Sequence, residues 1–199
     1  MAARAAGRAP ARKRADSRAP QVLERAAECF ARKGFEAASI RDIVRAVGML
    51  PGSLYSHFEN KDALLVAVYE EGVRRIMARV EGAIDGHTDP WVRLERACAA
   101  HIQALASRTA FAQVVVRVGP ADVPAARGRL IGLRESCEAL YRGLIDALPV
   151  REGTDRRAMR LMLLGALNWS PVWLRTSPGA ATAFAAAFVG FLRDGAGRE

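Results

Sequence analysis

A short segment, MLPGSLYSHFENK (49–61), gathers small, hydroxylated and ring-bearing polar side chains between two apolar runs. Gly52 is small enough for the backbone to approach another surface closely, and Tyr55 and His57 each combine a ring with a polar tip. Lys61 opens the next helical pattern, and the N–H groups at the start of a helix favour an anion such as a phosphate. Short donors beside a phosphate site suit the base edges and backbone of DNA. The segment therefore predicts a surface that binds the base edges and phosphates of DNA.

Helical patterns position this segment. Residues 19–35 carry apolar side chains at helical spacing, and residues 39–48 repeat the pattern over a shorter stretch that ends at Gly48. Pro51 suits the first turn of a third, very short helix, 51–58. Two short helices joined by a glycine-containing turn form a helix-turn-helix, and the longer helix before them completes a three-helix core.

The rest of the chain also has helical patterns, and the brief β-branched run VVVRV lies among helix signals. We therefore expect an all-α fold of about nine helices. Six helices follow the first three, at residues 60–84, 90–107, 109–118, 129–148, 154–174 and 177–192.

Positive charge is concentrated at the N-terminal end. The formal charge is +9, and residues 1–61 hold twelve Lys and Arg against six Asp and Glu. This excess favours a polyanion as partner. The opening basic run has no apolar core after it, as a signal peptide requires, and it reads as a disordered cationic arm. The arm is either a solubilising tail or a DNA-following segment, through Arg4, Arg8, Arg12, Lys13 and Arg14.

Other chemistry has less support. Cys29, Cys98 and Cys137 lie far apart with no CxxC spacing, so we expect no disulfide framework, metal site or cofactor, and a reducing cytoplasm fits best. The longest apolar stretches are shorter than the roughly 18 residues that a membrane span needs. An enzyme needs a nucleophile motif or paired acid and base, whereas His87 and His101 are isolated. A DNA-packaging protein is a further alternative, and it predicts equal, salt-sensitive affinity for any duplex.

From about Val22 to Tyr69 the chain resembles the DNA-binding domain of TetR-family transcriptional regulators. The resemblance rests on VLERAAECFARKGFEAASIRDIVRAVG and PGSLYSHFENKDALL, in which Gly48, Phe58 and Lys61 recur in order. It implies a ligand-responsive repressor that binds a palindromic operator as a homodimer. It also implies that the DNA contacts come from Ser39, Arg41, Pro51, Gly52, Ser53, Tyr55, His57 and Lys61.

The same resemblance divides the chain into a basic arm at 1–16, a helix-turn-helix DNA-binding domain at 17–62, and a helical effector-binding and dimerisation domain at 63–199. One position departs from the family pattern, because many members carry Ser or Thr as the cap before the third helix and this chain has Leu50. Capping must then fall to backbone geometry and to Pro51, and a phosphate contact from position 50 is in question.

The second part of the chain contains LLGALNWSPVWLR (163–175), which places Trp169 and Trp173 one helical turn apart around Pro171. The two indoles either pack in a core or dimer interface, or line a pocket. With MLPGSLYSHF, this stretch is similar to TetR-like repressors that answer acyl-CoA thioesters, which implies an apolar effector pocket with cationic groups at its mouth. Candidates for the lining are Phe111, Val115, Tyr141, Met162, Trp169 and Trp173.

Dimerisation has a separate physical basis. One short recognition helix reads only a half-site, so such proteins bind DNA as two-fold dimers. The last two helices combine small residues, which allow close approach, with large apolar residues that supply buried area. In the resembled family these helices form a four-helix interface, which here implies Leu161, Gly165, Phe184, Ala187, Phe188 and Phe191. Packing within one chain is the alternative for the same residues.

Overall fold

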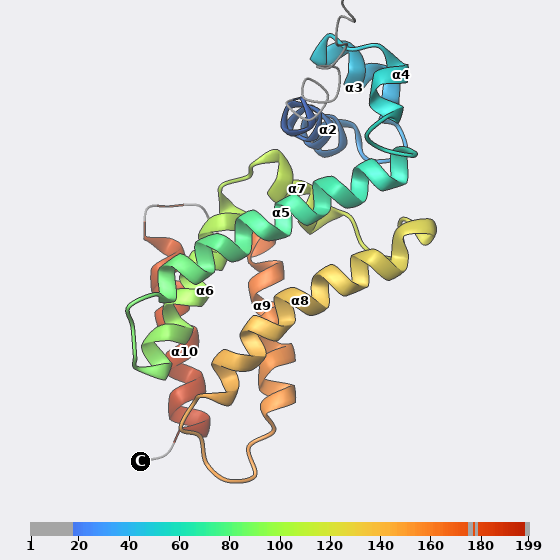
Figure 1. Cartoon of the computed structure of the whole chain (residues 1–199). Helices are drawn as coiled ribbons and strands as arrows, with labels where there is room; N and C mark the ends of the chain where they lie inside the picture. Colours follow the sequence, from blue (N-terminus) through green and yellow to red (C-terminus); the bar gives the residue numbers. More distant parts are fainter. Residues whose placement is uncertain (1–17, 175–176, 178, 198–199) are drawn as a thin grey trace, which may run out of the picture.

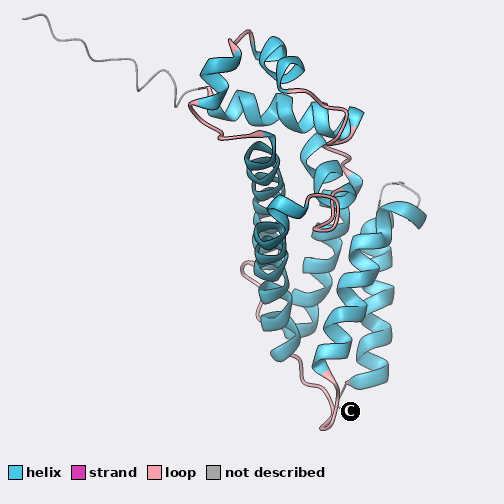
Figure 2. Ribbon diagram, turned by 90° about the vertical axis from the view of Figure 1, so that its right-hand side faces the viewer, coloured by secondary structure: helices cyan, strands magenta, loops and turns pink. Residues whose placement is uncertain are grey.

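One long helix, α5 (Lys61–Ile84), runs from the three short helices at one end of the molecule into its longer helical body (Figure 1). The computed structural model describes residues 18–174, 177 and 179–197. Figure 2 shows the three short helices lying across the top of the longer ones. The basic arm expected at 1–16 lies outside the described residues, so its contact with DNA stays a prediction.

The short helices form the helix-turn-helix unit. Ser39 starts the second of them, because its Oγ accepts a hydrogen bond from the backbone N–H of Asp42 at 3.1 Å. Gly48 ends this helix in the left-handed conformation, φ 66°, which glycine adopts without steric cost. The three helices are α2 (Ala19–Lys33), α3 (Ile40–Val47) and α4 (Pro51–Tyr55).

The helical body is built around α6 (Pro90–Ala106), which contacts α5, α9 and α10. Within the described residues the chain forms nine α-helices, one short 3₁₀ turn and no named strand, which confirms the all-α prediction. The remaining elements are α7 (Ala110–Arg117), η1 (Pro124–Ala126), α8 (Arg127–Asp146), α9 (Arg156–Trp173) and α10 (Ala180–Ala196).

Two hydrophobic cores hold these helices together. The first joins α2, α3 and α4 to α5, to α7 and to the start of α8, and it includes Phe30, Leu54 and Phe111. The second lies among α6, α8, α9 and α10, and it includes Leu94 and Leu163. The expected boundary between residues 62 and 63 stays a prediction, and the first core contains residues from both sides of it. The three N-terminal helices are therefore packed onto the longer helical body.

No helix in the part of the chain that the structure describes is both long enough and apolar enough to span a lipid bilayer.

Candidate DNA-binding surface and effector cavity

Helix α4 has a buried side and an open side. Leu54 is 1% exposed and holds α4 against the first core. Gly52 and Ser53 are exposed, and Tyr55 leaves 53% of its surface open. A Cβ added at Gly52 would meet no atom within 4 Å, and the backbone there is not left-handed. Nothing within the described fold requires glycine at this position, so the missing side chain leaves room for an outside partner.

Leu50 sits at the entry to α4 and is 77% exposed. Its backbone is extended, its side chain makes no capping hydrogen bond, and Pro51 occupies the first turn. The expectation that backbone geometry and Pro51 replace a side-chain cap is confirmed. An apolar side chain here cannot hydrogen-bond a phosphate, but it can contact the methyl group of a thymine.

Lys61 already has partners within the protein. Its Nζ donates to the backbone carbonyls of Glu36 at 3.2 Å and Ala38 at 3.1 Å. The same ammonium group lies 4.4 Å from the ring centroid of Phe35. Lys61 therefore fastens the turn between α2 and α3 to the start of α5. A phosphate contact by Lys61 stays a prediction, and Nζ would have to make it while it keeps its hydrogen bonds to Glu36 and Ala38.

The predicted DNA contacts differ in how accessible they are. Ser39 Oγ is engaged in capping α3, and the ring of His57 lies 6.4 Å from that of Phe58. Only His57 and Lys61 are half-buried among the eight predicted contacts. The exposed ones are Ser39, Arg41, Pro51, Gly52, Ser53 and Tyr55.

A cavity of about 480 Å³, called the effector cavity below, opens among α5, α6, α7, α8 and α9. Its volume and its mainly apolar wall are typical of small-molecule sites. The polar groups on the wall are His101, Arg134, Glu138 and Asn168. The other lining residues are Tyr69, Val73, Ile76, Met77, Leu105, Val115, Val116, Cys137, Leu161, Leu164, Trp169 and Val172.

His101 is the most buried of these four polar residues, with only 3% of its surface exposed. Its Nδ1 lies 2.9 Å from the hydroxyl of Tyr141, whereas its Nε2 has no hydrogen-bond partner among the described residues. Burial lowers the pKa of His101 from 6.5 to about 4, although the Asn168 amide acts in the opposite direction. The imidazole is therefore neutral at neutral pH.

Two arginines determine the net charge where α8 forms the wall of the effector cavity. Arg160 Nε donates to Glu138 Oε1 at 2.9 Å, and Arg160 is only 8% exposed. Arg134 Nε donates to the hydroxyl of Tyr69 at 2.9 Å, while the residue itself is exposed. Because Arg160 neutralises Glu138, Arg134 supplies a positive charge where the cavity meets solvent.

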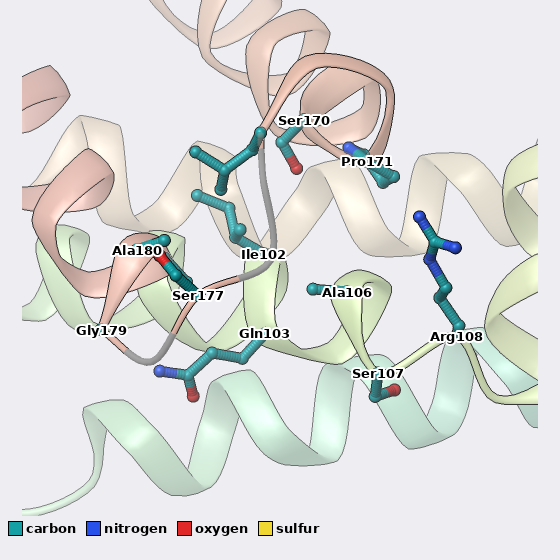
Figure 3. A pocket seen from close by; sticks show the side chains of 12 residues that line it. Ile102, Gln103, Ala106, Ser107, Arg108, Ser170, Pro171, Ser177, Gly179 and Ala180 are labelled. Carbon is teal, nitrogen blue, oxygen red and sulfur yellow. The ribbon is translucent and has the colours of Figure 1, made fainter.

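A second cavity, of about 440 Å³, lies between the ends of α6 and α9 and the start of α10. Figure 3 shows Ser170 and Pro171 across this space from Gln103 and Arg108. Its wall is made largely of small side chains, and it adjoins chain positions outside the described residues. Its polar side chains are Gln103, Ser107, Arg108, Ser170 and Ser177, of which only Ser170 is buried.

The cysteines are free thiols: Cys29 and Cys98 are buried, and Cys137 is half-buried. Burial raises the pKa of Cys98 to about 12 and that of Cys137 to about 11. Neither is thus held as a reactive thiolate at neutral pH. No group of three or more His, Cys, Asp or Glu side chains within the described ranges is arranged to hold a metal ion.

Two family models match the chain. Residues 22–68 match the bacterial regulatory proteins of the tetR family, and residues 87–196 match the tetracyclin repressor-like C-terminal domain. The chain belongs to the TetR family. Its members are transcriptional regulators, and this confirms the prediction of a DNA-binding regulator in place of an enzyme.

Relatives within the TetR family extend the match. The HTH-type transcriptional repressor KstR2 of Mycobacterium tuberculosis is 29% identical over 161 residues, or 80% of each chain. KstR2 of Mycolicibacterium smegmatis is 34% identical over 100 residues, so the match spans 50% of this chain and 48% of that protein.

Solved structures share the fold. FadR from Bacillus subtilis, in complex with stearoyl-CoA, has a TM-score of 0.74 at 19% identity, covering 87% of this chain and 96% of that one. AibR, in complex with isovaleryl coenzyme A and operator DNA, has a TM-score of 0.70 at 19% identity, covering 87% of this chain and 97% of that one. The shared fold thus extends over 87% of this chain and over nearly the whole of FadR and AibR.

The six residues predicted to line a TetR effector pocket have three different surroundings. Val115 and Trp169 lie on the wall of the effector cavity. Phe111 and Tyr141 are buried at 2% and 0% exposure in the two cores, and neither lies on the wall.

The other two candidates lie on the outer side of α9. Met162 is 62% exposed and Trp173 is 44% exposed. The ring of Trp173 packs on Phe184, 4.9 Å between centroids, and Trp169 has a different role on the cavity wall. Each step along a helix rotates a side chain by about 100°, and the sequence does not give the rotation of α9 about its axis.

An apolar face covers the outside of α9 and α10. Of the residues predicted to form a TetR dimer interface, Phe184 and Phe188 are half-buried against the second core, with their rings stacked at 5.9 Å. The other four are exposed: Leu161, Gly165, Ala187 and Phe191. Large apolar side chains left open on this face are Leu161, Met162, Trp169, Val172, Trp173 and Phe191. Such a face marks an interaction surface.

The polar part of the effector cavity is missed by sequence reasoning. His101 looks isolated along the chain because its partner Tyr141 is 40 residues away. Arg134 and Glu138 stand one turn apart in a helix that carries other charged residues, so nothing local marks them. The one available signal is Asn168, a polar residue within an otherwise apolar stretch beside Trp169.

Proposed function

We propose that this protein is a cytoplasmic, ligand-responsive repressor that binds a palindromic operator as a homodimer and releases it when an acyl-CoA thioester fills the effector cavity. The exposed side of α4 reads the major groove of each half-site, with Gly52, Ser53 and Tyr55 facing the bases.

The observation that carries the proposal is that α7 lines the effector cavity and also contacts α2, the helix against which α3 packs. Val115 of α7 lines the effector cavity, and Arg117 of the same helix donates from Nη1 to the backbone carbonyl of Ala31 in α2 at 2.8 Å. On its other side α7 packs tightly on α5, because a Cβ at Gly72 would lie 2.6 Å from Val115 Cγ2. A ligand that pushes on Val115 therefore has to displace α5 or α2.

A second set of contacts ties the same helices together. Arg75 of α5 pairs with Glu24 of α2 at 2.6 Å, and its guanidinium lies 4.0 Å from the ring centroid of Phe111 in α7. These contacts join α2, α5 and α7, so the effector and the operator would favour different arrangements of one unit. Each then weakens the binding of the other by the same factor.

The thioester class is supported by two kinds of observation. The fold neighbours FadR and AibR were solved with stearoyl-CoA and isovaleryl coenzyme A. In this chain the wall suits an apolar acyl group, and Arg134 at the open side suits a phosphate or other anion.

The dimer is supported by the apolar face on α9 and α10. Leu161, Trp169 and Val172 belong both to that face and to the wall of the effector cavity. A partner chain on this face would also close the outer wall of the cavity, so dimerisation and effector binding would share residues.

The experiment is fluorescence anisotropy with the intergenic DNA beside the protein's own gene and a scrambled duplex of equal length, at several salt concentrations. We expect the operator to bind at least about a thousandfold more tightly than the scrambled duplex. Stearoyl-CoA and isovaleryl-CoA are then titrated into the complex. Tyr55→Ala should abolish specific binding, whereas Val92→Ala, an exposed site on α6, should leave it unchanged.

The possible outcomes test the operator and the thioester effector separately. Equal affinities that vanish together with salt would indicate a DNA-packaging protein and refute the operator. A specific complex that no acyl-CoA releases would retain the regulator and refute the thioester as effector.

A further inference from the structure

We propose that the effector is an oxo compound, with a neutral carbonyl oxygen at its buried end that accepts a hydrogen bond from Nε2 of His101. This inference rests on the assignment of the effector cavity in the proposed function, and it adds the chemistry of the ligand's far end.

The starting observation is an unpaired polar atom in a buried place. His101 is 3% exposed and lines the cavity; the Asn168 amide lies near enough to raise its pKa, but Nε2 makes no hydrogen bond of normal geometry among the described residues. A buried polar group without a hydrogen bond is costly, and most such groups are satisfied in folded proteins. Because Nδ1 faces Tyr141, the opposite edge of the ring is the one left for a ligand.

The contacts of Tyr141 decide which ring nitrogen carries the proton. Its hydroxyl lies 2.9 Å from His101 Nδ1 and 3.4 Å from the backbone carbonyl of Ala97. The shorter contact favours donation from the phenol to Nδ1, and a neutral imidazole then holds its proton on Nε2. Burial also raises the pKa of Tyr141 well above 10, so the phenol keeps its proton. Nε2 is thus a donor, and it requires an acceptor on the ligand.

The charge at this depth selects the kind of acceptor. The pKa of His101 is lowered to about 4 by burial, so the ring offers a carboxylate no positive charge at neutral pH. Asn168 is exposed on the cavity wall, and its amide raises the pKa of His101 as a hydrogen-bond acceptor does, so a ligand oxygen takes the place of a weak acceptor that is already beside the ring. A ketone or ester oxygen fits the one neutral donor, Nε2 of His101, whereas a carboxylate would be buried without a counter-charge.

The anionic part of the ligand belongs at the other end. Arg134 is exposed and stands seven residues before Tyr141 on α8, which places the two about 10 Å apart along the helix axis. Apolar side chains of α5 and α7 line the cavity between them. The cavity therefore selects a molecule with an anion or thioester at the mouth, an apolar middle and a carbonyl at depth.

The test uses two small probes that differ only at the relevant atom, cyclohexanone and methylenecyclohexane. The ¹⁵N shifts of the imidazole nitrogens are followed by NMR in the full-length protein, which has three histidines. His57 and His87 serve as internal controls, and His101→Leu assigns the signal. We expect the free protein to show the proton of His101 on Nε2, and cyclohexanone alone to shift that resonance.

Affinities provide a second measurement that does not depend on the shift. The ratio of the Kd values of the two probes is measured in the native protein and in His101→Leu, so that the different hydration of the probes cancels. Loss of one neutral hydrogen bond should move this ratio by roughly three- to tenfold against the ketone.

Three results would overturn the inference: a proton on Nδ1, no response of His101 to cyclohexanone, or the same Kd ratio in both proteins. These are distinct from failure of the proposed function. A complex released by acyl-CoA with a silent His101 refutes only the carbonyl site, and a responsive His101 with no thioester release refutes only the thioester.

Discussion

Replacing Gly52 by Ala should make the protein more stable and the operator complex weaker. The added methyl meets no atom within 4 Å, and the backbone at Gly52 is not left-handed, so the folded protein accepts it without strain. Alanine is a better helix former than glycine by up to about 1 kcal/mol. For a chain of this length that gain raises Tm by about 2–4 °C.

Gly52→Ala should lower the affinity for operator DNA although it raises the stability of the protein. If the missing side chain is what lets α4 approach the base edges, a methyl group costs at least about 1 kcal/mol of lost fit at each half-site. Both half-sites of a dimer carry the change, so the two penalties add to about 2 kcal/mol, or roughly thirtyfold in Kd.

The matched control is Gly128→Ala. Gly128 is the second residue of α8 as Gly52 is of α4, it is exposed, and a Cβ there also meets nothing within 4 Å. Both variants should gain similar stability in thermal unfolding, and only Gly52→Ala should lose operator affinity by anisotropy. Unchanged operator binding by Gly52→Ala would show that α4 does not approach DNA at this point.

Three further predictions concern the rest of the molecule. Gly72→Ala should destabilise the protein by about 1–3 kcal/mol in urea unfolding, because the new Cβ lies 2.6 Å from Val115 Cγ2, and a neutral result would mean that α5 and α7 separate easily. Burial lowers the pKa of His101 from 6.5 in the unfolded chain to about 4 in the folded protein, so as the pH falls the unfolded chain binds the proton first. The free energy of unfolding should therefore be highest above pH 6.5 and should fall by about 3 kcal/mol towards pH 4. His101→Gln should flatten that part of the pH profile, and equal slopes would contradict the burial argument. Phe191→Glu should convert a dimer into monomers in sedimentation velocity, whereas Leu50→Glu, at a similarly exposed apolar residue near α4, should leave it dimeric; a dimeric Phe191→Glu protein would place the interface elsewhere.

The helices and their ends were predictable because their signals are local. The caps at Ser39, Asn60 and Asp89 each accept a hydrogen bond from an N–H three residues further on, and such pairs are visible in the sequence. The same holds for Gly48, whose left-handed backbone ends α3. The buried edge of α4 and its open side follow from the same short-range spacing.

The effector cavity was less predictable because it depends on how distant helices face one another. The contact between Arg117 and the carbonyl of Ala31 spans 86 positions, and that between His101 and Tyr141 spans 40. No spacing rule connects such residues before the helices are packed. An aromatic residue such as Trp173 therefore suits a pocket by its type, although it packs elsewhere.

The hydrogen bonds of Lys61 and the length of α5 together allow a small movement near the effector cavity to become a larger one at the N-terminal end of α5. Its 24 residues make a rod about 36 Å long, with Ile76 roughly 12 Å from the end that rests against α6 and Lys61 about 34 Å from it. If α5 pivots as a rigid rod about that end, a displacement of about 1 Å at Ile76, which packs against Ala104 and Leu105 of α6, becomes about 3 Å at Lys61. The bonds of Lys61 to the carbonyls of Glu36 and Ala38 couple this end of α5 to the turn between α2 and α3. In the proposed dimer, two such displacements would change the half-site separation by about 6 Å out of about 34 Å. Under the proposed function, an effector that displaces α5 slightly near Ile76 would therefore move the two recognition helices out of register with the half-sites of the operator.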